Sequence, residues 1–340
     1  MNEVEELETR VRNLLEEEFT KFRDWFFELE NDLWDNQIQS DFRVGKFNKL
    51  IEKAREEFAQ GKRSRVMRKS IVLSCAVLAL VVGNLAEARP GGRLSEWLVG
   101  RHDGVQVPQP RGKQTMAYGT NNLQQFDFYP TTNGNRRAPL VLFVHGGGWK
   151  RGSKDTADGS WKAPHYIGLG YAYASINYRL VPNSTVEDEA ADVAAALRYL
   201  IDHADQLSFD PGRIVIMGHS AGAHLVALVG TDEQYLKHAG LSFASIAGVL
   251  PIDGAAYDVS RQIKEGNDFM HDTYIQVFGE DPARQHALSP TLHAQVPNAP
   301  AFLIIHVQRT DGVAQSKELE ASLKQAGTPV ERQEFPGTWA

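Results

Sequence analysis

The chain has 340 residues, of which 42% are hydrophobic and 23% charged, as in a globular protein of one large or two ordinary domains. The formal net charge of −7 belongs to residues 1–60, so the remainder is neutral overall. Nothing in this balance suggests a nucleic-acid-binding footprint, which would need a clustered basic face. Cys75 is the only cysteine, which excludes an intrachain disulfide framework and a cysteine-based metal cluster.

Residues 1–61 form an acidic head. Apolar residues recur there at three- and four-residue spacing, which predicts a pair of amphipathic helices. The stretches LWDNQIQSD at 33–41 and GKFNKL at 45–50 resemble a small bacterial antitoxin of the toxin–antitoxin pairs. The resemblance implies that residues 1–60 bind a toxin. The alternative is that this head comes from a mis-called start codon or a gene fusion.

Residues 62–88 are organised like a secretory signal peptide. A basic stretch leads into an apolar run at 70–83, and the small-residue pattern AEA follows at 86–88. Because signal peptides begin at the start codon, we expect translation to start at Met67 and the product to be periplasmic or secreted. The alternative is a membrane anchor through residues 70–86, although roughly 20 apolar residues usually span a bilayer.

Strand and helix patterns alternate from residue 126 onward, after a Gly- and Pro-rich extended entry at 89–125. This alternation predicts an α/β fold with a mostly parallel sheet and helices on both faces. The predicted strands are 126–130, 139–144, 172–180, 214–216, 246–252, 301–307 and 330–335. The predicted helices are 186–207, a helix that starts directly after Ser220, and 314–326.

The motif GHSAG at 218–222 lies between a β-branched strand and an Ala- and Leu-rich helix. This strand–turn–helix setting is the one that a G-x-S-x-G nucleophile elbow requires. Gly218 and Gly222 allow the sharp turn and the close packing of the helix on the strand. The turn places the Ser220 hydroxyl at a helix N-terminus, where backbone amides favour negative charge. The motif therefore predicts a nucleophilic serine.

A second motif, HGGGW at 145–149, directly follows a predicted buried strand. Consecutive glycines leave their backbone N–H groups bare, so an oxygen of the substrate can reach them. Acyl transfer develops an oxyanion in its tetrahedral intermediate, and each fixed donor aimed at it contributes on the order of 3 kcal/mol. Paired with a downstream G-x-S-x-G, the motif predicts an oxyanion hole.

These two motifs, with NYRL at 177–180, DPGR at 210–213 and IDGAAYD at 252–258, resemble the α/β-hydrolase superfamily. The resemblance covers residues 126–340. Its nearest branch is the carboxylesterases, with the hormone-sensitive-lipase-like enzymes and the acetylxylan or feruloyl esterases. It implies an α/β-hydrolase domain over residues 89–340, preceded by the helical segment, and it implies neither a metal nor an organic cofactor.

The resemblance also implies roles for single residues. Ser220 is the nucleophile, and the oxyanion hole consists of the backbone amides of Gly147, Gly148 and Ala221. Asp311, after the next-to-last strand, is the triad acid that orients the base. The remaining candidates are Asp253 and Asp258 as weaker choices for the acid, and Arg179 with Asp192 as a structural ion pair beneath the site.

The sequence departs from the family where the catalytic base is expected, just after the last strand. It reads FPGTWA at 335–340, and Trp339 stands in the place of the histidine. An indole nitrogen only donates, so Trp339 cannot take the serine proton. His271, His286 and His293 are loop histidines that could substitute. We expect a C-terminally truncated or frame-shifted form of an active parent; the alternative is a catalytically dead hydrolase.

The sequence thus predicts a serine carboxylic-ester hydrolase that forms an acyl-enzyme. Its expected substrates are short acyl esters or esters linked to carbohydrate, either as small molecules or on polysaccharide. The missing histidine predicts impaired activity. A ligand-binding protein without turnover, or a formamidase or amidase with the same serine, are the alternatives.

Overall fold

The computed structural model describes residues 110, 112–132, 134, 137–157, 162–265 and 268–335, with six single positions nearer the N-terminus (10, 11, 14, 15, 18 and 22). The signal-peptide-like segment and Trp339 lie outside the described residues. So does the acidic head, apart from those single positions. The expectations for these parts of the chain, including the domain boundaries, stay predictions.

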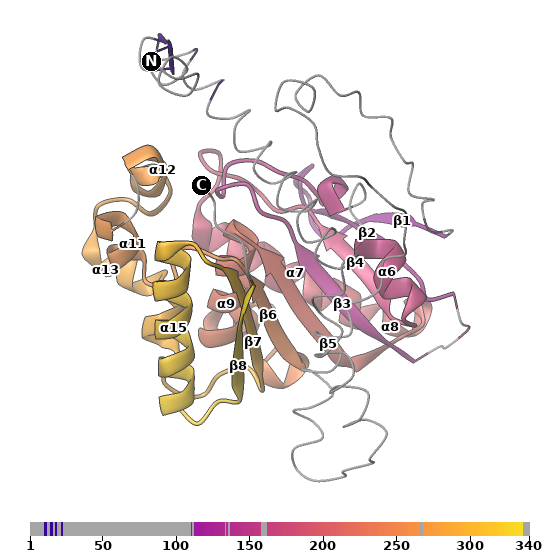
Figure 1. The fold of residues 1–340 in the computed structure, drawn as a ribbon. Coiled ribbons are helices and arrows are strands. Elements are labelled where there is room, and N and C mark those ends of the chain that lie inside the picture. The colour runs from indigo at the N-terminus through magenta and orange to yellow at the C-terminus, as the bar shows by residue number, and fades with distance from the viewer. Residues whose placement is uncertain are drawn as a thin grey trace, which may run out of the picture.

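An eight-stranded sheet runs through the molecule in the order β1-β2-β4-β3-β5-β6-β7-β8 (Figure 1). The β1–β2 and β2–β4 pairings are antiparallel, and every other pairing is parallel. The strands are β1 (Gln114–Ala117), β2 (Gln125–Tyr129), β3 (Ala138–Val144), β4 (Ala172–Ile176), β5 (Phe209–His219), β6 (Gly248–Ile252), β7 (Phe302–Val307) and β8 (Val330–Phe335). The predicted α/β fold with a mostly parallel sheet is confirmed.

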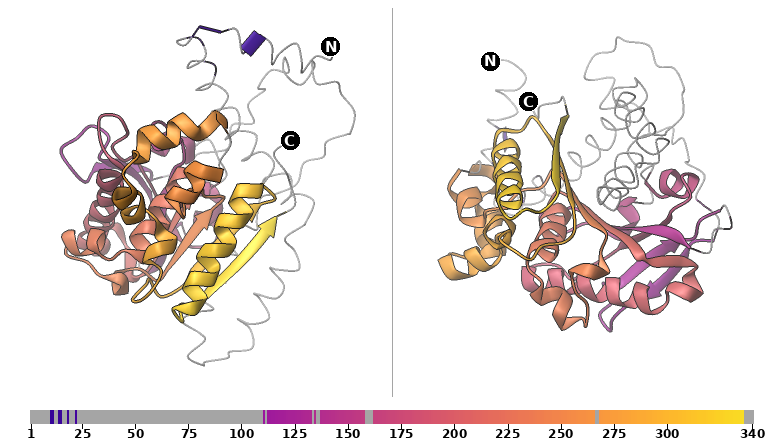
Figure 2. Two further views of the ribbon diagram at one scale, coloured as in Figure 1. Left: turned by 90° about the vertical axis from the view of Figure 1, so that its left-hand side faces the viewer. Right: turned by 90° about the horizontal axis from the view of Figure 1, so that it is seen from below.

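Helices lie on both faces of this sheet. Apolar side chains of α7, α9 and α15 join one core cluster with the strands, and those of α6 join a second cluster on the other face. Figure 2 shows α15 running alongside β8. The α-helices are α6 (Lys162–Gly168), α7 (Val186–Asp202), α8 (Ala204–Leu207), α9 (Ala221–Thr231), α10 (Gln234–His238), α11 (Val259–Glu265), α12 (Asp268–Phe278), α13 (Pro282–Ala287), α14 (Pro290–His293) and α15 (Thr310–Gln325).

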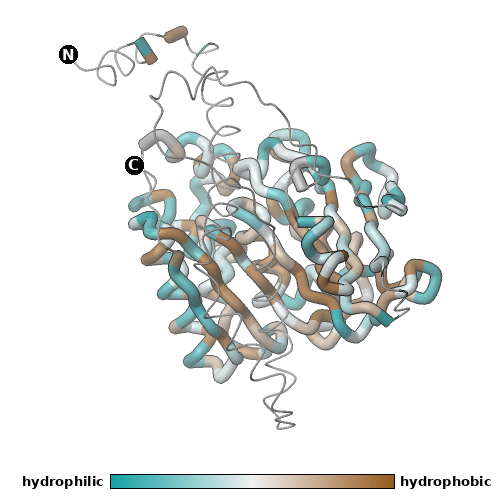
Figure 3. Tube along the Cα trace, turned by 45° about the vertical axis from the view of Figure 1, so that its right-hand side comes forward, coloured by the Kyte–Doolittle hydropathy of each residue, from teal (hydrophilic) through white to brown (hydrophobic). Residues whose placement is uncertain are grey.

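The central strands are buried because they are apolar along their whole length. In β6 every residue is buried, and in β7 every residue except the last. A parallel strand that helices cover on both faces has no polar side to present, which explains the continuous apolar runs. The tube coloured by hydropathy is brown along these strands and teal on the outer turns (Figure 3). The core therefore follows the sheet.

Some boundaries differ from the expected ones. β4 ends at Ile176, earlier than predicted, because the chain beyond it leaves the sheet to make polar contacts. The long helix predicted at 186–207 is divided at His203 into α7 and α8. The edge strand β1 was not predicted, and neither were helices α10 to α14. Among the described residues, no helix is long and apolar enough to cross a membrane.

Candidate active site

Ser220 lies on a sharp turn between β5 and α9. Its backbone has φ 53° and ψ −117°, in the left-handed half of φ that side chains other than glycine rarely adopt. A Cβ at Gly218 would lie 2.1 Å from the carbonyl oxygen of Gly222, and a Cβ at Gly222 would lie 2.2 Å from that of Val144. Only glycine fits at these positions. A hydrogen bond from Ser220 N–H to Ile252 O, at 2.9 Å, helps to keep the strained backbone of Ser220 in place.

The glycine loop that follows β3 passes directly beside this turn. A Cβ built on Gly146 would lie 3.1 Å from the Cβ of Ser220, so the two motifs are in contact. Gly147 and Gly148 both have positive φ, 122° and 59°. At Gly147 a side chain is also excluded by space, because a Cβ there would lie 2.2 Å from Arg151 O. The glycines therefore allow the backbone of the loop to pass close beside Ser220, with no side chain between them.

Backbone amides at this junction are available to a ligand. Within the part of the chain that the structure describes, no hydrogen bond uses the N–H groups of Gly147 and Gly148. The N–H of Ala221 begins α9, and the first amides of a helix have no partner inside it. The structure thus brings together Ser220 and the three residues predicted for the oxyanion hole.

His145 and Tyr178 hold the base of the glycine loop. The Tyr178 hydroxyl donates to His145 O at 2.9 Å, and the two rings stack with centroids 4.3 Å apart. The Nδ1 of His145 donates to Gly146 O at 2.7 Å. Complete burial lowers the pKa of His145 to about 4. His145 is accordingly a neutral, structural histidine.

Asp311 lies in the first turn of α15, just after β7. Its carboxylate accepts hydrogen bonds from Arg309 Nε at 2.8 Å and from Gln262 Nε2 at 3.0 Å. Burial, the largest single influence, would raise the pKa of Asp311. The positive charge of Arg309 and these hydrogen bonds outweigh it, so the pKa lies below its ordinary value. Asp311 is therefore ionised and fixed in position.

Arg309 also joins Asp311 to Asp253, which is the next residue after β6. The guanidinium lies 3.4 Å from Asp253 Oδ2 and donates to Gly254 O at 3.2 Å. The sheet brings Asp253, Asp311 and Ser220 to one edge, because all three follow the carboxyl ends of adjacent parallel strands. The third candidate acid, Asp258, caps the start of α11 instead, accepting from Arg261 N at 3.0 Å.

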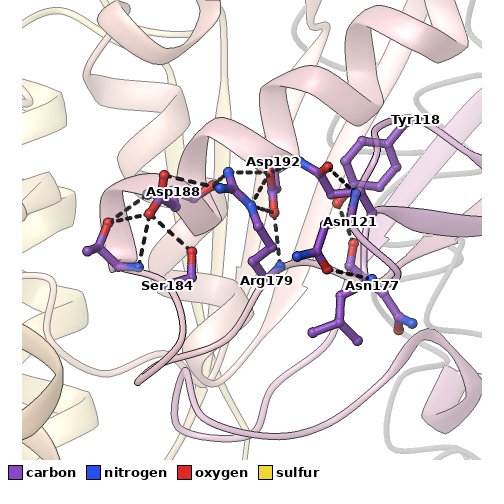
Figure 4. A network of polar contacts seen from close by, with 10 residues as sticks. Tyr118, Asn121, Asn177, Arg179, Ser184, Asp188 and Asp192 are labelled. Carbon is purple, nitrogen blue, oxygen red and sulfur yellow. Dashed lines mark hydrogen bonds and ion pairs between the residues drawn. The ribbon is translucent and has the colours of Figure 1, made fainter.

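The predicted ion pair between Arg179 and Asp192 is confirmed. Arg179 donates from both its backbone N–H and its guanidinium, with an Nη2–Oδ1 distance of 2.8 Å, and Asp192 is almost fully buried. Gln124 adds a hydrogen bond to the same carboxylate at 2.7 Å. Figure 4 shows how this network joins the start of α7 to the loop after β4. It anchors the segment that carries Tyr178.

Among the described residues, no histidine side chain has a hydrogen bond or ion pair to Ser220 or Asp311; the one bond from a histidine to Ser220 is the helical one from His224 N to Ser220 O, at 3.2 Å. Nδ1 of His271 bonds to Ile263 O at 3.2 Å, and Nε2 of His293 bonds to Ala287 O at 2.8 Å. His286 has a ring contact with His293. These three histidines were expected in loops but lie in α12, α13 and α14, and their contacts are with residues other than Ser220 and Asp311. Among the described residues, no cluster of His, Cys, Asp or Glu could hold a metal ion either.

Sequence reasoning missed three side chains that shape this site. Arg309 and Gln262 hold the acid, and His224 bonds to the last residue of the glycine loop, Trp149. Arg309 stands two residues before Asp311, which was a usable signal. The contacts of Gln262 and His224 join segments that lie far apart in the sequence, so no local pattern could have indicated them.

The sheet order, the strained serine turn and the adjoining glycine loop define an α/β-hydrolase. Residues 126–323 match the BD-FAE family, and the chain belongs to it. The Arabidopsis thaliana protein "Probable isoprenylcysteine alpha-carbonyl methylesterase ICMEL1" is 29% identical over 217 residues, 58% of this chain and 44% of that protein. "Carboxylesterase NlhH" of Mycobacterium tuberculosis is 38% identical over 91 residues, 27% of this chain and 28% of that protein.

Solved structures share the fold. "Truncated form of carbohydrate esterase from gut microbiota" superposes with a TM-score of 0.59 at 20% identity, covering 67% of this chain and 89% of that one. This chain spans less than half the length of the two curated relatives above. Their similarity supports membership of the family.

Proposed function

We propose that this chain is a serine hydrolase of carboxylic esters that works through an acyl-enzyme. The observation that carries the proposal is the contact between the strained Ser220 turn and a glycine loop whose amides are free to bind an oxyanion. The names of the curated relatives support it, since they are called carboxylesterase and methylesterase.

In the proposed reaction, the Ser220 hydroxyl oxygen bonds to the ester carbonyl carbon while a base takes the hydroxyl proton. The negative oxygen that forms lies against the amides of Gly147, Gly148 and Ala221, which stabilise it by about 3 kcal/mol each. The alcohol then leaves with the proton, and water releases the acid from Ser220 by the same steps. Asp311 orients the base and stabilises its charged form.

The proposed reaction needs a catalytic base, and the described residues do not supply a histidine for it. No imidazole among the described residues is hydrogen-bonded to Ser220 or Asp311, and the sequence places Trp339 where the base is expected. Because indole cannot accept a proton at nitrogen, we expect slow turnover. Removal of a triad member typically lowers kcat about 10⁴-fold or more.

The test is hydrolysis of p-nitrophenyl acetate by the full chain and by Trp339→His, Trp339→Phe and Ser220→Ala variants. We expect Trp339→His to raise kcat at least about 100-fold, a general-base effect. Trp339→Phe, which removes the indole without adding a base, should not. Combining Trp339→His with Ser220→Ala should abolish the gain.

Two results would change the proposal. If the unchanged chain hydrolyses the ester rapidly and needs Ser220, the esterase stands but the base lies elsewhere. The other result is a Trp339→His variant that folds but does not hydrolyse the ester. If that variant binds the ester with the same affinity as Ser220→Ala does, the chain is a ligand-binding protein without turnover. The observation that favours this second candidate is that no described imidazole is hydrogen-bonded to Ser220 or Asp311.

The substrate class follows from the neighbours alone. We propose short acyl esters or carbohydrate-linked esters, the latter because one structural neighbour is named a carbohydrate esterase. A formamidase or amidase would use the same serine and oxyanion amides, so a panel of matched p-nitrophenyl esters and anilides separates the two. Secretion after translation from Met67, and toxin binding by residues 1–60, stay proposals from sequence.

A further inference from the structure

Trp149, the last residue of the glycine loop, is tied to the helix that carries the nucleophile. Its indole Nε1 donates to Nδ1 of His224 at 3.2 Å, and the rings meet edge to face with centroids 5.4 Å apart. Trp149 is 1% exposed and has φ 60°, a backbone conformation that a bulky residue rarely adopts. A strained, buried tryptophan therefore depends on its partners to stay in place.

The hydrogen bonds of His224 determine its protonation state. Indole is a donor only, so Nδ1 must carry a lone pair, and Nε2 lies 2.9 Å from Leu288 O, which only accepts. His224 is thus neutral with its proton on Nε2. Complete burial, which lowers the pKa of His224 to about 4, is consistent with this assignment. Both ring nitrogens are engaged, so His224 is not available as the missing base.

This chain of two hydrogen bonds joins three separate segments. Trp149 belongs to the glycine loop, His224 is four residues beyond Ser220 on α9, and Leu288 ends α13. Trp149 also packs edge to face against Phe278 of α12, at 4.8 Å between centroids. The link sets the distance between the oxyanion amides and the nucleophile, and functional groups must be held within about 0.5 Å of their productive positions.

We propose that Trp149 and His224 are a positioning pair, which holds the oxyanion amides of the glycine loop in register with Ser220. The inference rests on the proposed function for its catalytic effect, but the coupling of the loop to α9 does not. Neither residue touches the reacting atoms. Their role is to keep the Gly147 and Gly148 amides where the oxyanion forms.

Three substitutions separate the two hydrogen bonds. Trp149→Phe removes the indole donor and keeps an aromatic ring in the core. His224→Asn places an amide oxygen near the position of Nδ1, so the bond from Trp149 can persist. His224→Gln places an amide nitrogen near the position of Nε2, so only the bond to Leu288 O can persist. His203→Gln is the control, since His203 bonds to Tyr199 O at the far end of α7.

The first measurement is amide hydrogen exchange of Lys150, Arg151 and Val181 in the full chain, because their N–H groups donate to the carbonyl oxygens of Gly147 and Trp149 in the glycine loop. We expect Trp149→Phe and His224→Gln to speed exchange of these amides at least about tenfold, and His224→Asn and His203→Gln to change it less than about threefold. The double variant Trp149→Phe/His224→Gln should be no faster than either single one, because both remove the same bond. Equal effects of His224→Asn and His224→Gln would overturn the proposal.

The second measurement is esterase kinetics in the Trp339→His background. We expect kcat to fall about tenfold in Trp149→Phe and His224→Gln with KM within about twofold, less than the 10²–10³ that loss of an oxyanion donor costs. If kcat is unchanged in variants that fold, Trp149 and His224 only pack in the core and do not position the oxyanion amides. If Trp339→His itself is inert, the proposed function fails, while the exchange result still decides the coupling.

Discussion

At the scale of single residues, Arg309 is the side chain on which the candidate acid depends. It bridges Asp311 and Asp253, whose side chain is 3% exposed, and thereby keeps two carboxylates of like charge at one sheet edge. Without that cation, each carboxylate would lose a charge-assisted hydrogen bond, and such bonds contribute about 1.5–3 kcal/mol. Arg309 is therefore as much a part of the site as the acid it holds.

Arg309→Met should lower the free energy of unfolding by about 2 kcal/mol at pH 7. Arg309 lowers the pKa of Asp311 in the folded chain. The stabilisation is therefore present above the pKa that Asp311 has in the unfolded chain, and it disappears as the pH falls through the pKa of Asp311 in the folded chain. The difference between variant and wild type should accordingly shrink in acid. Urea unfolding at several pH values measures it. Arg198→Met, which breaks an exposed pair with Asp202, is the control and should cost below about 1 kcal/mol; equal losses would refute the prediction.

At the scale of elements, α7 begins with a strong capping signal and also contains a buried carboxylic acid without a hydrogen-bonding partner. Thr185 and Asp188 form a capping box that satisfies the first amides of the helix. In the same first turn, Glu189 is fully buried, and neither of its carboxylate oxygens has a hydrogen-bonding partner. The nearby Val181 N–H donates to Trp149 O instead. Burial raises the pKa of Glu189 well above its ordinary value, so the folded helix holds a neutral acid.

Glu189→Met should stabilise the protein, and the gain should grow as the pH rises. The carboxyl of Glu189 has a higher pKa in the folded chain than in the unfolded chain, so its contribution to stability is fully present only below the unfolded pKa. As the pH rises, the carboxyl ionises first in the unfolded chain, and the contribution is lost. The difference amounts to about 1.4 kcal/mol for each pH unit in which only the unfolded form is charged. Chemical unfolding of wild type, Glu189→Met and the exposed control Glu280→Met at pH 5 and 7 tests this; a gain that does not depend on pH would contradict it.

At the scale of the whole molecule, the polar groups buried behind the site couple its stability to pH. His145 and His224 are both fully buried, and burial lowers the pKa of each to about 4. His306 shifts in the same direction for the same reason. The buried Glu189 has the opposite effect on how the free energy of unfolding depends on pH. The native sheet and its loops therefore hold neutral histidines that an unfolded chain would protonate.

In the Glu189→Met background, the free energy of unfolding should fall as the pH is lowered from 7 to 5. The unfolded chain takes up protons near pH 6.5, whereas the folded histidines stay neutral until about pH 4, so acid favours unfolding. Each fully buried histidine should contribute about 2 kcal/mol over this interval. Adding His224→Asn should remove one such contribution, as measured by urea unfolding at both pH values. An unchanged slope would show that His224 is accessible to protons in the native state.

The elements that the sequence predicted best are those with a complete local signal. β3, β6, β7 and β8 lie within two residues of the expected ranges, because continuous apolar runs bounded by turns identify buried strands. β1 was missed because Gln114–Ala117 is a short edge strand, exposed except at Met116, and has no apolar run. β4 ended early because Tyr178 and Arg179 bond to His145 and Asp192, which are remote in the sequence.

The sequence by itself determined the elbow at Ser220 and the glycine loop. Both are backbone geometries that only certain residues permit, so the requirement is visible in the local order of amino acids. Tertiary structure alone decided what surrounds them: Arg309 between two carboxylates, and Trp149 against His224. A hydrogen bond between residues 75 positions apart depends on how the strands and helices pack, and that packing leaves no periodic trace in the chain.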